Sequence, residues 1–193
     1  MTGQPVIRRT DVCILGAGLA GLSLARQLHQ RKPDLSITLV EHRRYPVVEA
    51  AHKVGESTVE IASHYFSEML GLRDHMRQQQ LPKFGLRLFF RGKQAITDDV
   101  SRYDEVGPST VLPIPTFQID RGRFENHLAA ECRAQGIGLF DQTTIRNIKL
   151  SAGQHCVTVR SDDSEQTIQA RYLVDASGRR AWPDDGLGST AGC

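Results

Sequence analysis

The sequence has 193 residues, of which 39% are hydrophobic and 24% are charged, and its formal net charge is +2. This length allows one domain, or one domain with an appendage. The small net charge gives no indication of a nucleic-acid partner, and no run approaches the ~20 apolar residues that span a membrane. The four cysteines include no C-x-x-C pair and the seven histidines show no metal-ligand spacing. We therefore expect a cytoplasmic protein with reduced thiols, no secretion signal and no metal site.

The first elements in chain order predict a βαβ unit. An apolar strand is expected over residues 8–15, a helix over 19–31 and a second apolar strand over 36–41. This succession implies two parallel strands joined by a right-handed crossover. The expected fold class is therefore α/β with a parallel core sheet.

The later elements are shorter and more varied. A helix is expected over 58–70, ended by Gly71. Its inward-facing stripe should consist of Val59, Ala62, Phe66, Met69 and Leu70. A strand is then expected over 83–90, a polar loop over 99–115, and a helix over 121–135 that Asp120 can cap and Gly136 ends. A meander packed on the sheet follows, with strands over 143–150, 155–161 and 166–170. An apolar strand over 171–178 and a disordered tail over 181–193 come last.

The clearest motif is G-x-G-x-x-G, at the junction of the first strand and the first helix. Its first glycine permits a tight turn, its second lets the backbone approach a pyrophosphate, and its third lets the helix pack on the strand. The helix N-terminus adds N–H groups and a partial positive charge. Glu41 ends the second strand, where a carboxylate can hold ribose hydroxyls, and this favours FAD or NAD over NADP. The cofactor-binding residues expected here are Gly16, Ala17, Gly18, Ala20, Gly21 and Glu41.

The segment VGEST, residues 54–58, has a structural and a functional interpretation. Ser57-x-x-Glu60 is a capping box, which would open the next helix without any ligand. A capping box does not explain Gly55, and a glycine just ahead of a helix suits close approach by a ligand. Because this segment and a meander follow the βαβ unit, we expect FAD rather than NAD. Val54, Gly55 and Ser57 are then expected to contact the cofactor.

Three other features carry weaker signals. The DASG turn, residues 175–178, is either an ordinary turn or a second approach to the cofactor, through Asp175 and Gly178. Arg123 lies in the first turn of a helix, where a cation opposes the helix dipole and needs a partner such as Asp120 or a bound phosphate. Arg44, in a short basic cluster after the second strand, is either a solvated loop residue or a cofactor contact.

These motifs together resemble the flavin-dependent halogenase family, often named tryptophan halogenases, within the wider class of FAD-dependent monooxygenases. The resemblance covers roughly residues 11–180. It rests on five motifs in this order: GAGLAG, HKVGEST, LPKFGLRLFF, FQIDRGRFE and LVDASGRR. The first and last occur across FAD-dependent monooxygenases, whereas KVGEST and KFGLRLFF point more specifically to halogenases.

The resemblance implies an FAD-binding domain of the glutathione-reductase type and a particular chemistry. In such enzymes reduced FAD, supplied by a separate flavin reductase, reacts with oxygen and halide. The resulting hypohalous acid passes to a lysine beside an aromatic or other electron-rich small molecule. Lys83 occupies the matching position, although its spacing alone favours a solvated strand end. Its ammonium could polarise the oxidant, or its amine could carry the halogen. Lys53 is a rival, but it adjoins the cofactor loop.

The sequence departs from this family in two ways. Family members are much longer and carry a W-x-W-x-I-P motif, whereas the one tryptophan here is Trp182. The resemblance also ends after Arg180, as expected for a truncated, frame-shifted or split gene product. We therefore expect a partial FAD-binding domain over residues 8–180, which would not halogenate by itself. An aromatic-ring hydroxylase and an inactive dinucleotide-binding fragment are the alternatives to a halogenase.

Overall fold

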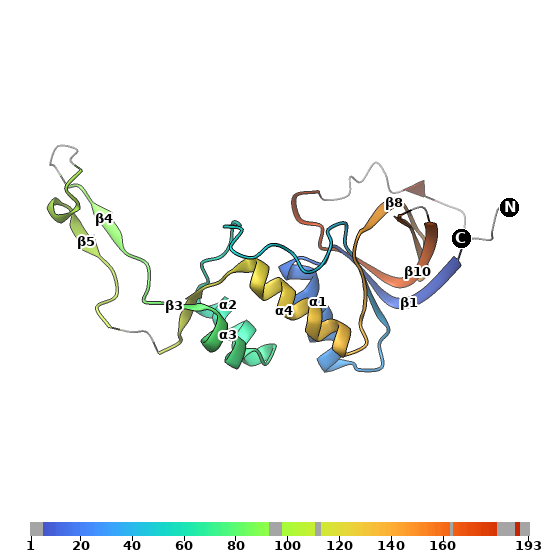
Figure 1. Ribbon diagram of the computed structural model, residues 1–193, viewed down its shortest axis with the longest axis horizontal. Coiled ribbons are helices and arrows are strands. Elements are labelled where there is room, and N and C mark those ends of the chain that lie inside the picture. The colour runs from blue at the N-terminus through green and yellow to red at the C-terminus, as the bar shows by residue number, and fades with distance from the viewer. Residues whose placement is uncertain (1–5, 93–97, 111–112, 163, 181–187, 190–193) are drawn as a thin grey trace. The chain divides into compact units, whose positions relative to one another are not determined.

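The computed structural model describes residues 6–92, 98–110, 113–162, 164–180 and 188–189, which belong to two compact units (Figure 1). Unit 1 comprises Met1–Ala51 and Arg121–Cys193, and unit 2 comprises His52–Asp120. The two ends of the chain thus belong to one unit, and the middle of the chain forms the other.

A mixed sheet forms the centre of unit 1. Among the residues that the structure describes it has seven strands in the order β11-β8-β9-β10-β1-β2-β7. Four neighbouring strands are parallel, namely β10, β1, β2 and β7. The pairs β8–β9 and β9–β10 are antiparallel, and β11 runs parallel to β8. The parallel part confirms the expected α/β class. The bounds are β1 Val6–Leu15, β2 Ile37–Val40, β7 Gly138–Phe140, β8 Thr143–Leu150, β9 His155–Ser161, β10 Ser164–Asp175 and β11 Gly188–Ser189.

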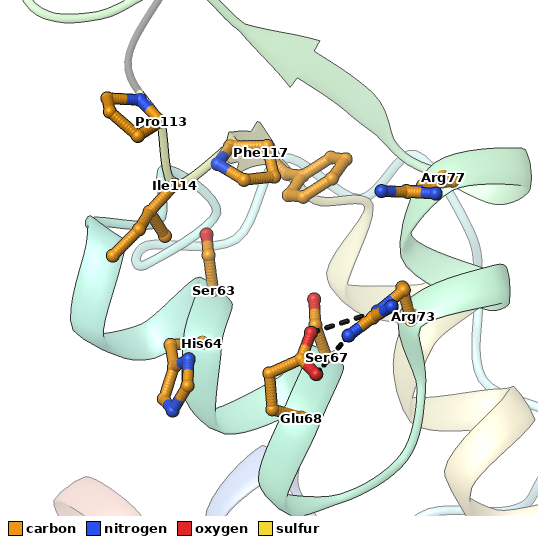
Figure 2. Close-up of a pocket in the computed structure, with 10 residues that line it drawn as sticks. Ser63, His64, Ser67, Glu68, Arg73, Arg77, Pro113, Ile114 and Phe117 are labelled. Carbon is orange, nitrogen blue, oxygen red and sulfur yellow. Dashed lines mark hydrogen bonds and ion pairs between the residues drawn. The ribbon is translucent and has the colours of Figure 1, made fainter.

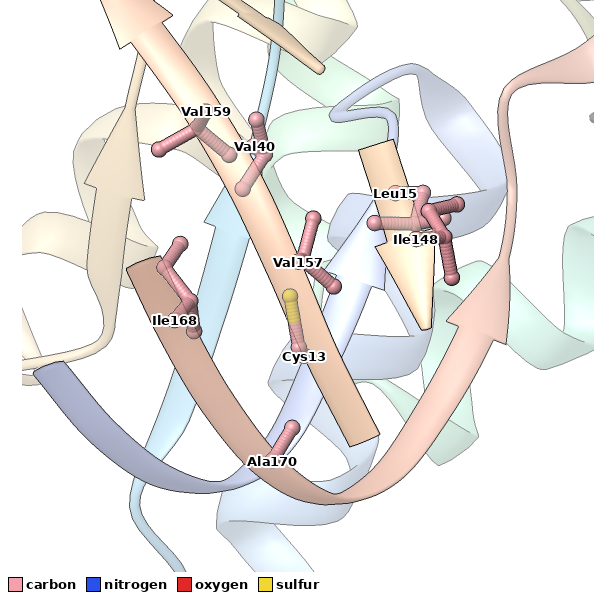
Figure 3. Packing of buried hydrophobic residues seen from close by; sticks show 8 residues of the cluster. All are labelled: Cys13, Leu15, Val40, Ile148, Val157, Val159, Ile168 and Ala170. Atoms are coloured by element: carbon pink, nitrogen blue, oxygen red, sulfur yellow. The ribbon is translucent and has the colours of Figure 1, made fainter. Parts of the chain in front are cut away.

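Residues 12–15 of strand β1 are buried on both faces, as is usual for a parallel strand between two layers, whereas residues 7–9 are exposed. Ile14 faces helix α1 (Leu19–Arg31), because its Cγ2 lies 3.3 Å from the position of a Cβ built on Gly21. Cys13 and Leu15 point to the opposite face and pack against the meander (Figure 3). The meander therefore extends the sheet and also packs on it, as predicted. This cluster consists of Cys13, Leu15, Val40, Ile148, Val157, Val159, Ile168 and Ala170.

Helices α1 and α4 (Arg121–Ala134) lie side by side in unit 1 (Figure 1). Arg26 Nη1 donates to Glu131 Oε2 at 3.0 Å, and Leu22 and Leu128 are fully buried. Helix α4 ends before Gly136, which has a φ of +79°, so the predicted glycine stop is confirmed. The bounds of α1 agree with the sequence prediction, and those of α4 differ from it by one residue.

Unit 2 consists of short elements. Helix α2 continues directly into a π-helical turn, η1, and Gly71, with a φ of +66°, separates this turn from α3. Two small antiparallel pairs, β3 with β6 and β4 with β5, complete the unit. The bounds are α2 Glu60–His64, η1 Tyr65–Met69, α3 Arg73–Gln79, β3 Leu81–Lys83, β4 Leu88–Phe90, the 3₁₀ turn η2 Val100–Arg102, β5 Asp104–Val106 and β6 Thr116–Gln118.

Several strand predictions are wrong in detail. The strand expected over 83–90 is broken into β3 and β4, because Gly85 has a φ of +150°. The strands expected over 166–170 and 171–178 form one strand, β10, because β1 pairs with it along its length. Sequence reasoning missed β7, which has only three residues, and placed a loop where η2 and β5 lie.

The expected helix over 58–70 also differs. It begins at Glu60 after Val59, which makes no side-chain capping bond, so the proposed capping box of Ser57 and Glu60 is wrong. Phe66 and Leu70 are buried as predicted, but Val59 and Met69 are 58% and 41% exposed. The π-helical turn explains part of this difference, because its wider winding rotates the residues that follow it.

The cysteines and the C-terminal segment differ from expectation as well. Cys13 and Cys132 are free and buried, and burial raises the pKa of the Cys13 thiol to about 12. Cys156 is disulfide-bonded, so the prediction of reduced thiols is wrong for this residue. Residues 181–187 and 190–193 of the expected tail, including Trp182, lie outside the described residues, and Gly188–Ser189 form β11. Over the described ranges, no helix is long and apolar enough to cross a membrane.

Candidate functional site

The glycine-rich turn lies where β1 ends and α1 begins, in unit 1. Gly16 has a φ of +99°, and its N–H donates to Val40 O at 2.8 Å. A Cβ on this residue would stand 2.6 Å from Ala176 O. The first glycine is therefore required both by the backbone conformation and by close contact with a second turn.

That second turn is the predicted DASG segment. Asp175 pairs with Leu15 at the end of the parallel ladder, and Ala176 N donates to Leu15 O at 2.8 Å. The Asp175 carboxylate accepts hydrogen bonds from the Ser177 N–H, at 2.9 Å, and from its hydroxyl, at 2.6 Å. Gly178 follows with a φ of +71°. The structure thus brings the two predicted turns together at one edge of the sheet.

The other two glycines of the motif differ in what surrounds them. A Cβ on Gly21 would stand 2.0 Å from Gly16 O, so this glycine lets α1 pack directly on the turn. Gly18 precedes α1 in an extended conformation, and a Cβ there would meet only Arg43 Nη2, at 3.8 Å. Ala20 is exposed in the first turn of the helix. The space beside Gly18, at a helix N-terminus, fits the pyrophosphate of a dinucleotide.

Glu41 is buried directly beneath this turn, with 4% of its surface exposed. Its carboxylate accepts from the Ala17 N–H, the Arg43 N–H and Arg43 Nε, each at 2.9 Å. Burial acts to raise the pKa of Glu41, but the hydrogen bonds from Arg43 and Ala17 outweigh it and hold the pKa below its usual value. The carboxylate is therefore charged and braces the glycine turn.

Arg43 is a site residue that sequence reasoning missed, because Arg44 was selected from the same pair. Its guanidinium donates to both Glu41 and Glu125, with Nη1 lying 3.4 Å from Glu125 Oε2. Glu125, on α4, is fully buried and also accepts from Arg121 Nη2 at 2.5 Å. The i,i+4 spacing of Arg121 and Glu125 was the available sequence signal. These four charged residues link the turn to α4.

Tyr45 is a second residue that the sequence analysis missed. It is buried, its hydroxyl donates to Ala17 O, and its N–H donates to Asp141 Oδ2 at 2.7 Å. Burial raises the pKa of this phenol, so it is a neutral donor. Glu41 and Tyr45 together hold both the N–H and the carbonyl of Ala17, which makes the glycine turn rigid.

The predicted basic contacts lie at the surface of unit 1. Arg44 is exposed. Arg123 Nε donates to Glu49 Oε2 at 3.2 Å, so a carboxylate partner of this cation is Glu49. Between Arg121 and Arg123, Gly122 allows close packing, because a Cβ there would stand 2.1 Å from Val48 O. The roles of Arg44 and Arg123 toward a cofactor stay predictions.

Unit 2 brings the predicted lysine and one predicted loop residue into contact. Lys83 Nζ donates to Ser57 Oγ at 2.7 Å and to Thr58 O at 2.6 Å. Strand β6 makes this possible, because Ser57 bridges to Gln118 on one side of it and Lys83 pairs with Thr116 on the other. The remaining loop residues, Val54 and Gly55, are exposed. Gly55 has a φ of +87°, which requires glycine in practice.

In a comparison with known protein families, residues 9–191 match the sequence profile of the FAD binding domain family. The chain is 30% identical to the flavin-dependent halogenase chlA of Dictyostelium discoideum over 90% of this chain and 32% of that protein. It is 29% identical to the aklavinone 12-hydroxylase DnrF of Streptomyces peucetius over 93% of this chain and 38% of that protein.

A solved structure shows the same fold. The myxobacterial chondrochloren halogenase CndH matches with a TM-score of 0.74 and 24% identity, covering 94% of this chain and 40% of that one. The chain spans about a third of the length of the curated relatives reported above. The glycine turn, the parallel sheet and the profile match agree with one another. This chain belongs to the FAD binding domain family, and its relatives over most of its length include flavin-dependent halogenases.

Proposed function

We propose that this chain is the FAD-binding part of a flavin-dependent halogenase that acts on an aromatic or other electron-rich small molecule. FAD in its reduced form would supply the electrons that activate oxygen, and the activated oxygen would oxidise the halide. The observation that carries the proposal is the contact of Lys83 Nζ with Ser57 Oγ and Thr58 O, in the segment where halogenases have their lysine. The likeness to the Dictyostelium halogenase supports it.

The FAD-binding domain is proposed to span residues 8–180. The amides at the start of α1 bind the diphosphate, because the space beside Gly18 is open to a ligand and the helix end is positively polarised. Glu41 holds the ribose hydroxyls with its carboxylate and also braces the glycine turn. The other proposed cofactor contacts are Gly16, Ala17, Ala20, Gly21, Arg44, Val54, Gly55, Ser57, Arg123, Asp175 and Gly178.

Lys83 is proposed as the catalytic residue. An ammonium has three N–H donors, and within the described part of the chain two of them are directed at Ser57 Oγ and Thr58 O. One N–H is then left for the oxygen of a hypohalous acid, which makes the halogen more electrophilic. Lys53, the rival lysine, lies in the cofactor loop, where its backbone N–H donates to Glu56 Oε1 at 2.9 Å.

The partners follow from the proposed chemistry. They are a halide, an aromatic substrate and a separate flavin reductase that supplies reduced FAD. A cytoplasmic location stays a prediction of the sequence.

There are two alternatives to a halogenase. The likeness to an aklavinone hydroxylase favours ring hydroxylation, which uses the same cofactor without halide. A dinucleotide-binding fragment without its own activity is the second alternative, and the chain spans about a third of the relatives' length. Neither alternative assigns a catalytic role to Lys83.

One assay separates these functions. The chain is incubated with FAD, a flavin reductase, NADH and chloride or bromide, against indole, phenol and pyrrole substrates. Halogenated product that disappears in Lys83→Ala supports the halogenase, and hydroxylated product without halide dependence supports the hydroxylase. Peroxide without product, unchanged in Lys83→Ala, supports the fragment. Stabilisation of the chain by NAD and not by FAD would contradict the halogenase and the hydroxylase.

A further inference from the structure

Unit 2 contains a cavity of about 390 Å³ that none of the predicted site residues line (Figure 2). Its volume lies within the ~300–1,000 Å³ that is usual for small-molecule sites. It forms between the helical segment of unit 2 and the chain that leads into β6. The residues around it are Ser63, His64, Ser67, Glu68, Arg73, Arg77, Pro113, Ile114, Pro115 and Phe117.

One wall of this cavity is apolar. It comes from the segment entering β6. Its residues are Pro113, Ile114, Pro115 and Phe117 (Figure 2). Phe117 is nearly buried and is held by backbone bonds to Thr58, with Thr58 N donating to Phe117 O at 2.9 Å. Rigid apolar side chains of this kind suit the flat face of an aromatic ring.

The opposite wall carries charge. Glu68 and Arg73 form a two-point ion pair, with Arg73 Nε donating to Glu68 Oε1 at 3.0 Å (Figure 2). The hydrogen bond from Arg73 holds the pKa of Glu68 below its usual range, so this carboxylate is already charged and paired. Two arginines and one glutamate give the wall a formal charge of +1. Arg77 supplies the positive charge that Glu68 does not offset.

Two hydrogen bonds link the cavity wall to the proposed catalytic lysine, which does not itself line the cavity. Ser63, in the wall, shares a hydrogen bond of 2.8 Å with Thr58 through their hydroxyl groups. The carbonyl of the same threonine accepts from Lys83 Nζ at 2.6 Å. Thr58 therefore contacts Ser63 in the cavity wall through its hydroxyl group and Lys83 through its carbonyl.

We propose that this cavity binds an aromatic carboxylate. Its ring lies against Ile114 and Phe117, and its carboxylate pairs with Arg77. A neutral aromatic compound would leave the positive wall uncompensated, and a small anion without a ring would leave the apolar wall empty. This binding does not require FAD.

The experiment uses the chain without FAD and measures binding by ¹⁹F NMR. The probes are 4-fluorobenzoate and its neutral counterpart 4-fluorobenzyl alcohol, with benzoate and acetate as competitors. We expect saturable binding of 4-fluorobenzoate, at least ~10-fold tighter than the alcohol, as a charge-assisted hydrogen bond provides. Benzoate should displace it and acetate should not.

Variants assign the binding to this cavity. Arg77→Gln should reduce the affinity for 4-fluorobenzoate to that for the alcohol, and Ile114→Asp should weaken both probes. Arg102→Gln, an exposed arginine of unit 2 outside the cavity lining, is the matched control and should bind as the parent does. Circular dichroism establishes that each variant is folded.

The inference is overturned if 4-fluorobenzoate does not saturate, if the alcohol binds equally well, or if Arg77→Gln keeps the preference for the acid. A parallel titration with FAD separates this result from the proposed function. FAD binding without benzoate binding removes the cavity proposal alone. Benzoate binding without FAD binding removes the flavin function and leaves an aromatic carboxylate site.

Discussion

The central sheet of unit 1 and the β4–β5 ribbon of unit 2 bury their apolar side chains very differently. Leu39, in the middle of β2, is fully buried, whereas Leu88, in β4, is 48% exposed. Phe89 and Phe90, its neighbours on alternate faces of the same strand, are 48% and 53% exposed. A two-stranded ribbon is marginal by itself, and exposed apolar surface of this extent is typical of a contact region. The dinucleotide turn thus follows a well-buried strand end, whereas the ribbon leaves its apolar side chains half exposed.

The largest effect we expect is from truncating a core side chain of unit 1. Leu39→Ala should lower the free energy of unfolding by about 2–5 kcal/mol, because it removes buried contacts and leaves a cavity. Leu88→Ala, the matched change in unit 2, should cost less than about 1 kcal/mol, because half of that side chain is already in water. Urea denaturation followed by circular dichroism measures both. Equal losses of unfolding free energy would show that β4 is packed as tightly as β2.

A smaller effect should distinguish binding from stability within unit 1. Gly18→Val should leave the melting temperature of the FAD-free chain nearly unchanged, because its Cβ meets only Arg43 Nη2 at 3.8 Å. It should abolish the stabilisation by FAD, which amounts to about 2.7 kcal/mol at 100 times the dissociation constant. Thermal melts with and without FAD measure both quantities.

The control for that measurement is Gly21→Val. It should destabilise the chain even without FAD, because its Cβ would lie 2.0 Å from the backbone oxygen of Gly16. If Gly18→Val melts as low as Gly21→Val, the second glycine is structural and the argument for a pyrophosphate position fails.

A third effect concerns acid stability, and it compares a buried ion pair with an exposed one. The pKa of Glu41 is lowered in the folded chain, so its contribution is complete above its ordinary value of 4.5 and is lost as the pH falls through the folded value. Glu41→Gln should cost about 1–3 kcal/mol near pH 7. Its stability should then change less than that of the parent between about pH 5 and pH 3.

Glu68→Gln is the comparison for acid stability. Glu68 pairs with Arg73 in unit 2, but this pair is exposed, and exposed pairs contribute little. Its melting temperature should follow that of the parent at every pH. Melting curves from pH 3 to pH 8 test both variants, and identical curves for Glu41→Gln and the parent would contradict a bracing role for Glu41.

The last prediction concerns the β4–β5 ribbon, where we expect a small effect on stability. Replacing Leu88 and Phe90 by serine should change the free energy of unfolding by only a few tenths to about 1 kcal/mol, because both side chains are half exposed. The same change should lower self-association, measured by analytical ultracentrifugation, because it removes an exposed apolar surface. Unchanged self-association would show that the ribbon does not drive it.

The sequence predicted most of unit 1 and little of unit 2. The glycine spacing and the apolar strands located the turn, α1 and the parallel pairing, because these features depend on neighbouring residues and on regular patterns. The network of Arg43 with Glu125 could not be read, because the two residues lie 82 positions apart and meet only when α4 packs beneath the turn.

In unit 2 as well, the sequence did not predict contacts between residues of different elements. The capping box at Ser57 failed because this residue bridges to Gln118 and accepts from Lys83, and both partners come from later elements. The contact between Ser57 and Lys83 depends on β6, which follows both residues in the chain. Motifs identified these two residues, but only the fold brings them together.

The pairing of β1 with β10 has a consequence for how the chain is made. Leu15 lies opposite Asp175, so strands separated by 160 positions share one ladder, and 52–120 are synthesised in between. At ~5–20 residues per second, about 8 to 32 seconds pass between the synthesis of the two ends. During that time the edge of β1 that pairs with β10 has no partner strand. High contact order of this kind makes folding slow, and the nascent N-terminus would be a target for chaperones until the last strands leave the ribosome.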